Sequence, residues 1–488
     1  MSQPTSGYTR ESTAAESFRP EAHGIDYISE AERHGHPFSL FTLWFGAQAV
    51  LLIAGSGAAA AFPGMSFTWY VIAIVTGTIL GSLLACAHAA QGPTIGIPQM
   101  IQTRAQFGFL GGALPMAIIL FAWFIFLPPS AALFGQVLQS LVSGISVRWG
   151  VVIFTILAFA VAMWGYDLCH RYAQIAAAAS VITLGAMTGV IIANHPFGNG
   201  VHINAGPFQS GIFFGVFGLA FILAAAYSGG VADYSRYLPR TTSNLRAGIW
   251  TGLGIGVPTI WLCCLGIGIT LASKGNPDLV GLFTTAGNTV GGWFTTIFFA
   301  AALFALIAQG FIIIYVGGNT AMSLISSLTL RDSAPKPSAA TRACFVVPVA
   351  AIGLLLGEIA TGGVGTFLND CLSVLLVLIV PWSAINLADF YLIRRGHYSI
   401  ADMFTPHGRY GFLNARGYAA YFITLACEVP FLHVLSFEGP VASALGGGDI
   451  SFIVGIILGV GLYWALLRTK VTRKPITPEE ATSKVELA

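Results

Sequence analysis

The sequence predicts an all-α integral membrane protein with twelve transmembrane helices, and two observations lead to this fold class. First, 55% of the 488 residues are hydrophobic and only 9% are charged, whereas soluble domains carry about 25% charged residues. Second, the chain divides into apolar runs of about 20 residues, the length that crosses a bilayer as a helix. No run of alternating apolar and polar residues predicts an extended β-strand.

The predicted spans follow one another with short polar connections. They cover residues 37–62, 67–90, 110–140, 149–166, 172–193, 209–230, 246–272, 292–316, 341–358, 365–393, 413–434 and 450–467. Residues 1–37 are polar and lack a positively charged start followed by an apolar core, so we expect an N-terminal tail rather than a cleaved signal peptide. The charged segment 468–488 is expected to be a C-terminal tail.

The distribution of basic residues predicts the orientation. With twelve spans and a cytoplasmic start, all of the 22 Lys and Arg residues except Arg148 and Lys274 fall on the inner side. Moving the count by one span would scatter them over both sides, against the positive-inside rule. Both termini are therefore expected in the cytoplasm of a plasma-membrane protein.

Two spans contain small polar interruptions. The sixth ends in Tyr227-Ser228-Gly229-Gly230, and the first contains Ala54-Gly55-Ser56-Gly57. Freed backbone groups are costly in lipid and are tolerated where they line a cavity or ligand site. We therefore expect helix breaks at Gly55, Gly57, Gly229 and Gly230, on the edges of a binding site.

The two interruptions lie five spans apart, so their helices run in opposite directions. This offset is typical of an inverted repeat of five plus five helices. The first repeat would cover residues 38–193 and the second 209–393. The two helices within 413–467 would then be peripheral additions.

Several motifs appear in an order typical of one known family. They are Gly24-Ile25-Asp26-Tyr27-Ile28 with Glu30-Ala31-Glu32-Arg33, the connector Pro98–Gly108, Trp164-Gly165-Tyr166-Asp167, Asp233-Tyr234-Ser235-Arg236-Tyr237-Leu238-Pro239 and Asn386–Arg395. In these stretches, from about residue 20 to 440, the chain resembles the nucleobase–cation symporter family, in its purine/cytosine permease branch. The resemblance implies a LeuT-like fold with a ligand site midway through the membrane.

The resemblance also suggests aromatic binding residues. A nucleobase is a flat heterocycle, and stacking on an aromatic ring contributes roughly 1–3 kcal/mol per base. Trp123 looks like the family's stacking tryptophan, and Tyr227 lies where similar permeases place a second aromatic residue. Phe221 is a weaker alternative on the same helix. The competing interpretation for each ring is ordinary helix packing.

Amide side chains would read the edge of a base. Gln48 and Gln309 stand in apolar runs, where an unpaired amide is costly, so each pairs with either the base or another helix. For Asn319 we expect a structural role. Leu127 occupies a place where family members often carry an amide, which leaves the base preference open.

Hydroxyl and acidic side chains indicate which ion the chain would co-transport. Sodium-coupled relatives carry a Ser/Thr pair midway along span eight, but Gly310–Ile314 here has no hydroxyl. A proton instead needs a titratable group facing the cavity. Asp370 ranks first, followed by Glu428, with Glu358 as a further candidate. We expect co-transport of H⁺ rather than Na⁺, and no cofactor.

Two acidic–basic combinations are expected at the inner face. Asp233 with Arg236 and Asp389 with Arg394 would form ion pairs that fix loops, and the first is also a candidate inner gate. No metal site is expected, because no histidine pair has ligand spacing within a span.

The predicted function is therefore secondary active symport of a nucleobase such as cytosine or a purine. The alternatives are other ring compounds (allantoin, hydantoin, a vitamin precursor) or an amino acid, with sodium as a possible ion. A channel would favour a repeated filter loop, and an enzyme a buried nucleophile or metal constellation; neither pattern is present in the sequence. The net charge of +2 argues against nucleic acid, so the expected partners are a small molecule and the lipid bilayer. The oligomeric state stays open.

Overall fold

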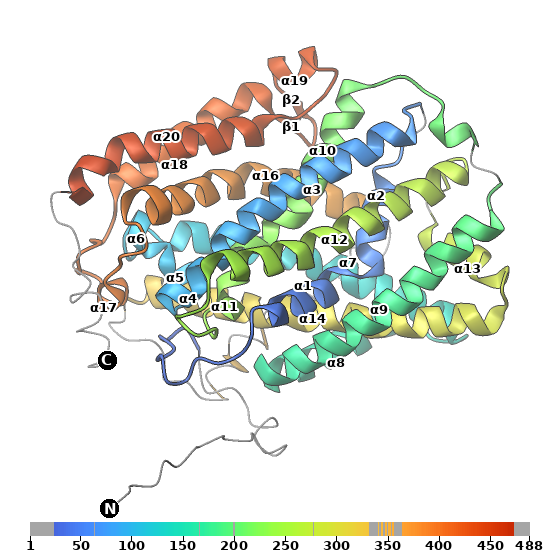
Figure 1. Ribbon diagram of the computed structural model, residues 1–488, viewed down its shortest axis with the longest axis horizontal. Helices are drawn as coiled ribbons and strands as arrows, with labels where there is room; N and C mark the ends of the chain where they lie inside the picture. The colour runs from blue at the N-terminus through green and yellow to red at the C-terminus, as the bar shows by residue number, and fades with distance from the viewer. Residues whose placement is uncertain are drawn as a thin grey trace, which may run out of the picture.

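The computed structural model describes residues 24–330 and 364–472, apart from Pro63, Gly165, 199–200 and Pro277, together with scattered residues between 340 and 355. Long helices run side by side across the molecule (Figure 1). The long helices are α3 (Phe67–Ala89), α7 (Ala113–Leu141), α8 (Val147–Trp164), α9 (Tyr166–Asn194), α10 (Ser210–Ala225), α12 (Asn244–Ala272), α14 (Gly292–Leu328), α16 (Val364–Leu387), α18 (Ala415–Glu428) and α20 (Ser451–Thr472).

Shorter elements connect these helices or interrupt them. They are α1 (Phe38–Gln48), α2 (Leu51–Ala59), α4 (Gln91–Ile95), α5 (Gln99–Gln102), α6 (Arg104–Phe107), α11 (Val231–Ser235), α13 (Leu279–Asn288), α17 (Ile400–Met403), α19 (Pro440–Ala444), the 3₁₀ turns η2 (Val201–Asn204), η3 (Ala226–Gly229) and η5 (Val429–Phe431), and the π-helical turn η4 (Ala388–Ile393). A two-residue hairpin pairs β1 (His433–Val434) with β2 (Phe437–Glu438).

Eight of the described helices are long and apolar enough to cross a membrane, and the bent pair α1 and α2 makes a ninth candidate. The fourth predicted span is the shorter apolar helix Val147–Met163, and α18 has 14 residues. Half of the ninth predicted span, 341–358, lies outside the described residues. The described part of the chain is therefore helical as predicted, while the number twelve is not confirmed.

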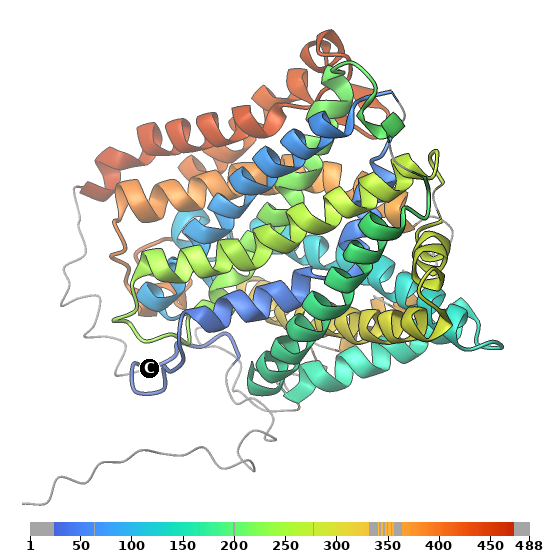
Figure 2. The same cartoon turned by 45° about the vertical axis from the view of Figure 1, so that its right-hand side comes forward.

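The packing of the two halves follows the inverted repeat. Helix α3 packs along α10, and α12 packs along α1 and α2. The second helix of each half thus lies against the first helix of the other half. Helices α7 and α14, the third of each half, pack on each other. The pair α18 and α20 packs against α16 at one edge of the bundle (Figures 1 and 2).

The first broken helix is interrupted earlier than predicted. Helix α1 ends at Gln48, and α2 begins at Leu51 after a 56° bend, because Val50 has an extended backbone. Gly55 and Gly57 lie inside α2, so the prediction that they break the helix is wrong. A Cβ at Gly57 would come 2.5 Å from the carbonyl oxygen of Cys263 in α12, so this glycine allows two helices to pack closely.

The second broken helix is interrupted at Gly229 and Gly230. Helix α10 ends at Ala225, the chain continues as η3 through Gly229, and α11 starts at Val231. The backbone of Gly230 has φ −147° and ψ 0°, away from both helical and sheet geometry. The chain therefore carries two separate helix breaks, one in each half.

The segment 24–37 covers one end of the bundle. The Ile28 N–H donates to the Gly96 carbonyl at 3.0 Å, and the His34 N–H donates to the Tyr237 carbonyl at 2.7 Å. Ile25 and Ile28 are fully buried. We call this end, which also carries α4, α5 and α17 (Figure 1), the N-terminal face, and the opposite end the far face.

Candidate functional site

Aromatic rings from both broken helices meet in the centre of the bundle. The Tyr227 ring, in η3, lies 5.2 Å from the ring of Trp44 in α1 and 6.1 Å from that of Trp123 in α7, measured between centroids. Phe126, one turn beyond Trp123, is also 6.1 Å from Tyr227. All four side chains are buried or nearly so. The breaks therefore bring together rings that stand far apart in the sequence.

Two further tyrosines extend the cluster toward the N-terminal face. The ring of Tyr234 in α11 lies 5.5 Å from Trp44 and 5.3 Å from Tyr315 of α14. We call Trp44, Trp123, Phe126, Tyr227, Tyr234 and Tyr315 the aromatic cluster. It joins α1, α7, α11 and α14, which surround the second break.

Polar atoms without partners lie around this cluster. The Gln309 carbonyl oxygen accepts from the Ser130 hydroxyl at 2.8 Å, and Gln309 neighbours the Tyr227 hydroxyl. Its Nε2 and the Nε1 of Trp123 are buried and have no hydrogen-bond partner among the described residues. A buried polar atom left unpaired costs about 1–3 kcal/mol, so these two donors favour the arrival of an acceptor.

Gln48 supplies an acceptor near the same break. Its Nε2 donates to the Thr259 hydroxyl at 2.7 Å and to the Leu223 carbonyl at 3.3 Å, one turn before Tyr227. Its Oε1 is buried and unpaired in the described part of the chain. Ring faces, two free donors and a free acceptor together suit a small planar molecule with a polar edge.

Phe221 does not join the aromatic cluster. Its ring centroid lies 4.9 Å from that of Phe452 in α20, at the edge of the bundle. Phe221 and Tyr227 are six residues apart, which turns a helix by about 240°, so the two rings point to different sides. The expectation that Phe221 contributes to the site is therefore not met.

Sequence reasoning missed four members of the cluster: Trp44, Phe126, Tyr234 and Tyr315. Trp44 stands one turn before Gln48, which was a usable signal. The others were hidden because the chain contains 35 Phe, 10 Trp and 15 Tyr. Which of these rings belong to the cluster depends on which helices meet at the break.

Asp233 and Arg236 connect the cluster to the N-terminal face. The Asp233 carboxylate accepts from the Gln99 N–H at 2.9 Å and from the Asn319 amide at 3.3 Å, so it ties α11 to α5 and α14. The Arg236 guanidinium donates to the backbone carbonyls of Gly24 and Asp26 at 2.9 and 3.1 Å. Arg236 therefore holds the N-terminal segment over this end of the bundle.

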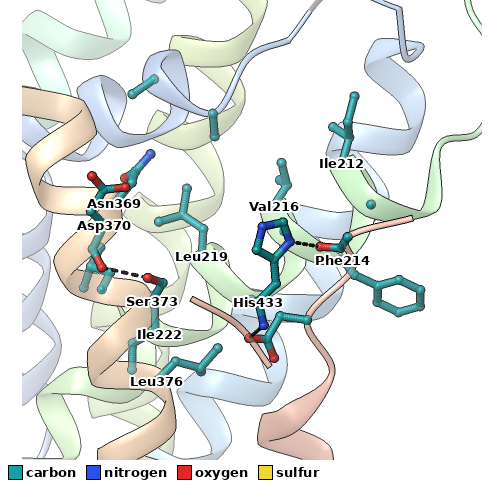
Figure 3. A pocket seen from close by; sticks show the side chains of 18 of the residues that line it. Ile212, Phe214, Val216, Leu219, Ile222, Asn369, Asp370, Ser373, Leu376 and His433 are labelled. Carbon is teal, nitrogen blue, oxygen red and sulfur yellow. Dashed lines mark hydrogen bonds between the residues drawn. The ribbon is translucent and has the colours of Figure 1, made fainter. Parts of the chain in front are cut away.

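A cavity of about 720 Å³ opens toward the far face. Asn369, Asp370 and Ser373 of α16 form one wall, and His433 stands on another (Figure 3). Asp449 also lines the cavity. Asp370 is exposed. Leu376 and Ile222 also line the cavity.

Glu428 is the most isolated acidic side chain of the candidates. It is fully buried, and neither carboxyl oxygen has a hydrogen-bond partner among the described residues. Gly455 of α20 lies against Glu428, and the absence of a side chain at Gly455 leaves the space that the Glu428 carboxyl group occupies. The third candidate, Glu358, lies outside the described residues.

Asp389 and Arg394 form an ion pair at the end of α16. The Nε of Arg394 lies 3.0 Å from both oxygens of Asp389, which also accept from the hydroxyls of Tyr398 and Tyr463. Burial opposes the charge of Arg394, but Asp389 raises the pKa of Arg394 above its ordinary value. This pair fixes the π-helical turn η4 at the N-terminal face.

Comparison with known proteins decides the family. The profile of a family described as permeases for cytosine and purines, uracil, thiamine and allantoin matches residues 27–455. The chain belongs to this permease family. The permease is 30% identical over 463 residues to a putative purine-cytosine permease, YxlA, of Bacillus subtilis, with 95% of the chain and 99% of that protein covered.

Other relatives agree with this family. The permease is 23% identical over 475 residues to a hydantoin permease of Microbacterium maritypicum, covering 92% of the chain and 89% of that protein. Its fold matches the solved structure of Mhp1, a nucleobase-cation-symport-1 family transporter in a closed conformation with bromovinylhydantoin bound. That match has a TM-score of 0.72 and 20% identity, and it covers 96% of this chain and 99% of Mhp1. The permease is therefore a membrane transporter of the nucleobase–cation symporter type and not an enzyme.

Proposed function

We propose that this permease carries a nucleobase, such as cytosine or a purine, across the plasma membrane in symport with a proton. The observation that supports this most directly is the aromatic cluster at the second helix break, with unpaired donors and an acceptor beside it. Rings and free amide groups are what a neutral, flat and polar-edged ligand requires.

In this proposal the substrate stacks between Trp123 and Tyr227. The Nε2 of Gln309 and the Nε1 of Trp123 donate to acceptors on its edge, and the Oε1 of Gln48 accepts from a ring N–H or amino group. Stacking contributes roughly 1–3 kcal/mol per ring. In the structure described here, the aromatic side chains pack on one another in the volume that the substrate would enter.

Both termini are proposed to lie in the cytoplasm. The N-terminal face would then be the inner face, and Asp233 and Arg236 would help to close it. The cavity beside Asp370 would be the outer vestibule. Substrate would move from this vestibule to the aromatic cluster as the two five-helix repeats, 38–193 and 209–393, rock about the broken helices.

Proton coupling is favoured over sodium coupling. The central part of α14, Gly310–Ile314, has no hydroxyl that could bind sodium. Asp370, exposed on the wall of the far-face cavity, is the proposed first proton acceptor. Glu428 is the second acidic candidate, but it lies on α18, outside the two repeats.

The alternative cargo is another ring compound, with hydantoin first because of the hydantoin permease of Microbacterium maritypicum. Allantoin, a vitamin precursor such as the thiamine named in the family description, or an amino acid with sodium coupling are the remaining alternatives. No basic side chain stands within the aromatic cluster, so an anionic ligand is disfavoured.

An uptake panel tests the proposal. Labelled cytosine, adenine, uracil, allantoin and hydantoin are offered to cells that lack their own carriers and express this permease. Uptake is measured without sodium and then with a protonophore. We expect saturable uptake of a nucleobase that survives sodium removal and is lost with the protonophore. Uptake of hydantoin alone would support the alternative cargo, and uptake that requires sodium would contradict proton coupling.

A further inference from the structure

A continuous chain of buried amide side chains runs from Gln99 of α5 to the Asp389–Arg394 pair. The Nε2 of Gln99 donates to Gln91 at 3.2 Å, Gln91 donates to Asn386 at 2.9 Å, and Asn386 donates to Gln106 at 3.3 Å. Gln106 then donates to the Asp389 carboxylate at 2.8 Å. Every donor points the same way, toward the negative charge, so the bonds reinforce one another.

His88 stands at the start of this chain. Its ring is fully buried and stacks on Trp382 of α16, with centroids 5.1 Å apart and planes 8° apart. Its Nδ1 lies 3.1 Å from the Nε2 of Gln99, and its Nε2 lies 2.8 Å from the Ser383 hydroxyl. Because the Gln99 amide donates to Nδ1, the imidazole carries its single proton on Nε2, which donates to Ser383.

An acceptor for a second proton is already present beside the ring. The Oε1 of Gln99 is buried and has no hydrogen-bond partner in the described part of the chain. Rotation of the Gln99 amide by half a turn would bring this oxygen to Nδ1. The same rotation would withdraw the Nε2 donor from Gln91 and open the first link of the amide chain.

We propose that His88 is the binding site of the coupling proton, a proposal that rests on the proton symport proposed above. Imidazole is the side chain whose ordinary titration lies between pH 5 and 8. A hydronium ion that enters from the far face gives its proton to Nδ1 and leaves as water. The same Nδ1 later returns the proton to water at the N-terminal face, so each cycle leaves the chain unchanged.

The position of His88 suits alternate access from the two faces. Its partner Ser383 lies seven residues beyond Leu376, which lines the far-face cavity, a distance of about 10 Å along the helix. Pro381 lies inside α16 between them, and a proline within a helix permits a bend at that point. Toward the N-terminal face, the amide chain separates His88 from Asp389.

The charged and titratable groups around His88 come from α3, from α11, and from η4 with the Arg394 that follows it. The Asp233 carboxylate of α11 accepts from the backbone N–H of Gln99, the residue whose side chain contacts His88. Asp389 and Arg394 stand at the other end of the amide chain, and the Tyr391 hydroxyl donates to the Ala87 carbonyl. Cys86 precedes His88 by two residues on α3.

Protonation of His88 would therefore weaken the contacts that hold the inner end of α16. Gln91 and Gln106 belong to the connector between α3 and α7, whereas Asn386 and Asp389 belong to α16 and η4. Breaking the Gln99–Gln91 bond loosens the amide chain between these two parts. Proton binding thus favours opening of the N-terminal face, which is the coupling that symport requires.

The test compares accumulation with exchange in liposomes that hold the purified full-length permease. An acidic outside pH drives accumulation of the labelled compounds of the uptake panel. Exchange of labelled against unlabelled compound is measured at equal pH, where no proton gradient is needed. For His88→Gln we expect accumulation to fall at least about tenfold while exchange stays within about twofold of the wild type. His407→Gln, at an exposed histidine of the N-terminal face, should keep both.

Other outcomes would overturn either the role of His88 or the proposed function. Accumulation by His88→Gln within twofold of the wild type overturns the role of His88, and so does a parallel loss of accumulation and exchange. If the wild type itself shows no proton-driven accumulation of any compound, the proposed function fails instead.

A second variant serves if His88→Gln does not fold. Gln99→Met removes the side-chain oxygen that would accept from the protonated Nδ1 of His88. The outside pH of half-maximal uptake should fall by about one unit, and an unchanged pH dependence would overturn the proposal.

Discussion

Trp123 lies directly against Gly230, the glycine at the second helix break. A Cβ added at Gly230 would come 2.8 Å from Cζ2 of the indole and closer still to Val316. Contacts of this kind are shorter than real Cβ atoms show, so the absence of a side chain at 230 allows the ring to sit at the break. This relationship joins the feature that interrupts the helix to the ring proposed to stack on the substrate.

Gly230→Ala should therefore impair transport through the position of Trp123. We expect saturable uptake to fall by at least about tenfold with the amount of folded protein unchanged. The matched control is Gly215→Ala in α10, where nothing lies within 4 Å of an added Cβ. Wild-type affinity in Gly230→Ala would show that the contact does not position the ring.

Trp123→Ala tests stacking itself. Loss of roughly 1–3 kcal/mol of stacking should raise the Kd about 5- to 150-fold, while Trp123→Phe keeps a ring and should lose less. Binding of the labelled substrate to purified protein is the measurement. Trp149→Ala, at a ring that is 64% exposed, is the control, and equal affinities in all three variants would remove Trp123 from the site.

Gln309→Leu tests recognition of the substrate edge. The substitution keeps most of the volume but removes the free Nε2 donor, so substrates with a ring acceptor should lose about 1–3 kcal/mol of binding. Comparing cytosine with analogues that lack individual ring acceptors should reveal which atom the amide reads. A variant that binds all analogues with wild-type affinity would indicate that Gln309 only connects α14 to Ser130 of α7.

Arg236→Met should release the N-terminal segment. The buried guanidinium binds the carbonyls of Gly24 and Asp26, and hydrogen bonds to a charged group contribute about 1.5–3 kcal/mol each. We expect faster proteolysis within residues 24–37 and a lower unfolding temperature. Arg240→Met is the matched control, because Arg240 pairs with Glu30 at the surface, where such pairs contribute about 0–1 kcal/mol. Equal effects of the two substitutions would argue against this role of Arg236.

Asp389→Asn should destabilise the fold strongly. The carboxylate binds Arg394, Gln106, Tyr398 and Tyr463, and removing one partner of a buried ion pair costs about 3–5 kcal/mol. Thermal unfolding of the purified protein measures the loss, with the exposed Glu438→Gln as control. An unfolding temperature equal to that of the wild type would mean that Arg394 finds other acceptors.

The helical fold and the second helix break were predictable from local sequence. Apolar runs of membrane length predict that a segment is a helix. The stretch Ser228-Gly229-Gly230 within such a run favours an interruption of that helix. The break in the first span was misplaced because Gly55 and Gly57 look the same in the sequence whether they end a helix or allow one to pack. Only the carbonyl of Cys263 facing Gly57 distinguishes the two.

The site was predictable in part. The family resemblance indicated Trp123 and Tyr227, and Gln309 stood out as an amide within an apolar run. The fold brings the three to one place. Tyr234 and Tyr315 could not be selected, since their contacts depend on how α1, α11 and α14 approach one another. His88 looked like a histidine at the end of a span until Gln99 and Ser383 were seen on either side of its ring.

By itself, the amino-acid sequence determined that this chain is a helical membrane protein, because hydrophobicity and local backbone preference act over neighbouring residues. The tertiary structure alone decided which rings meet at the breaks, which amides remain unpaired and which histidine joins α3 to α16. Those properties arise from residues far apart in the sequence, such as His88 and Ser383, which are 295 positions apart. Nothing short-range in the chain encodes the distance between them.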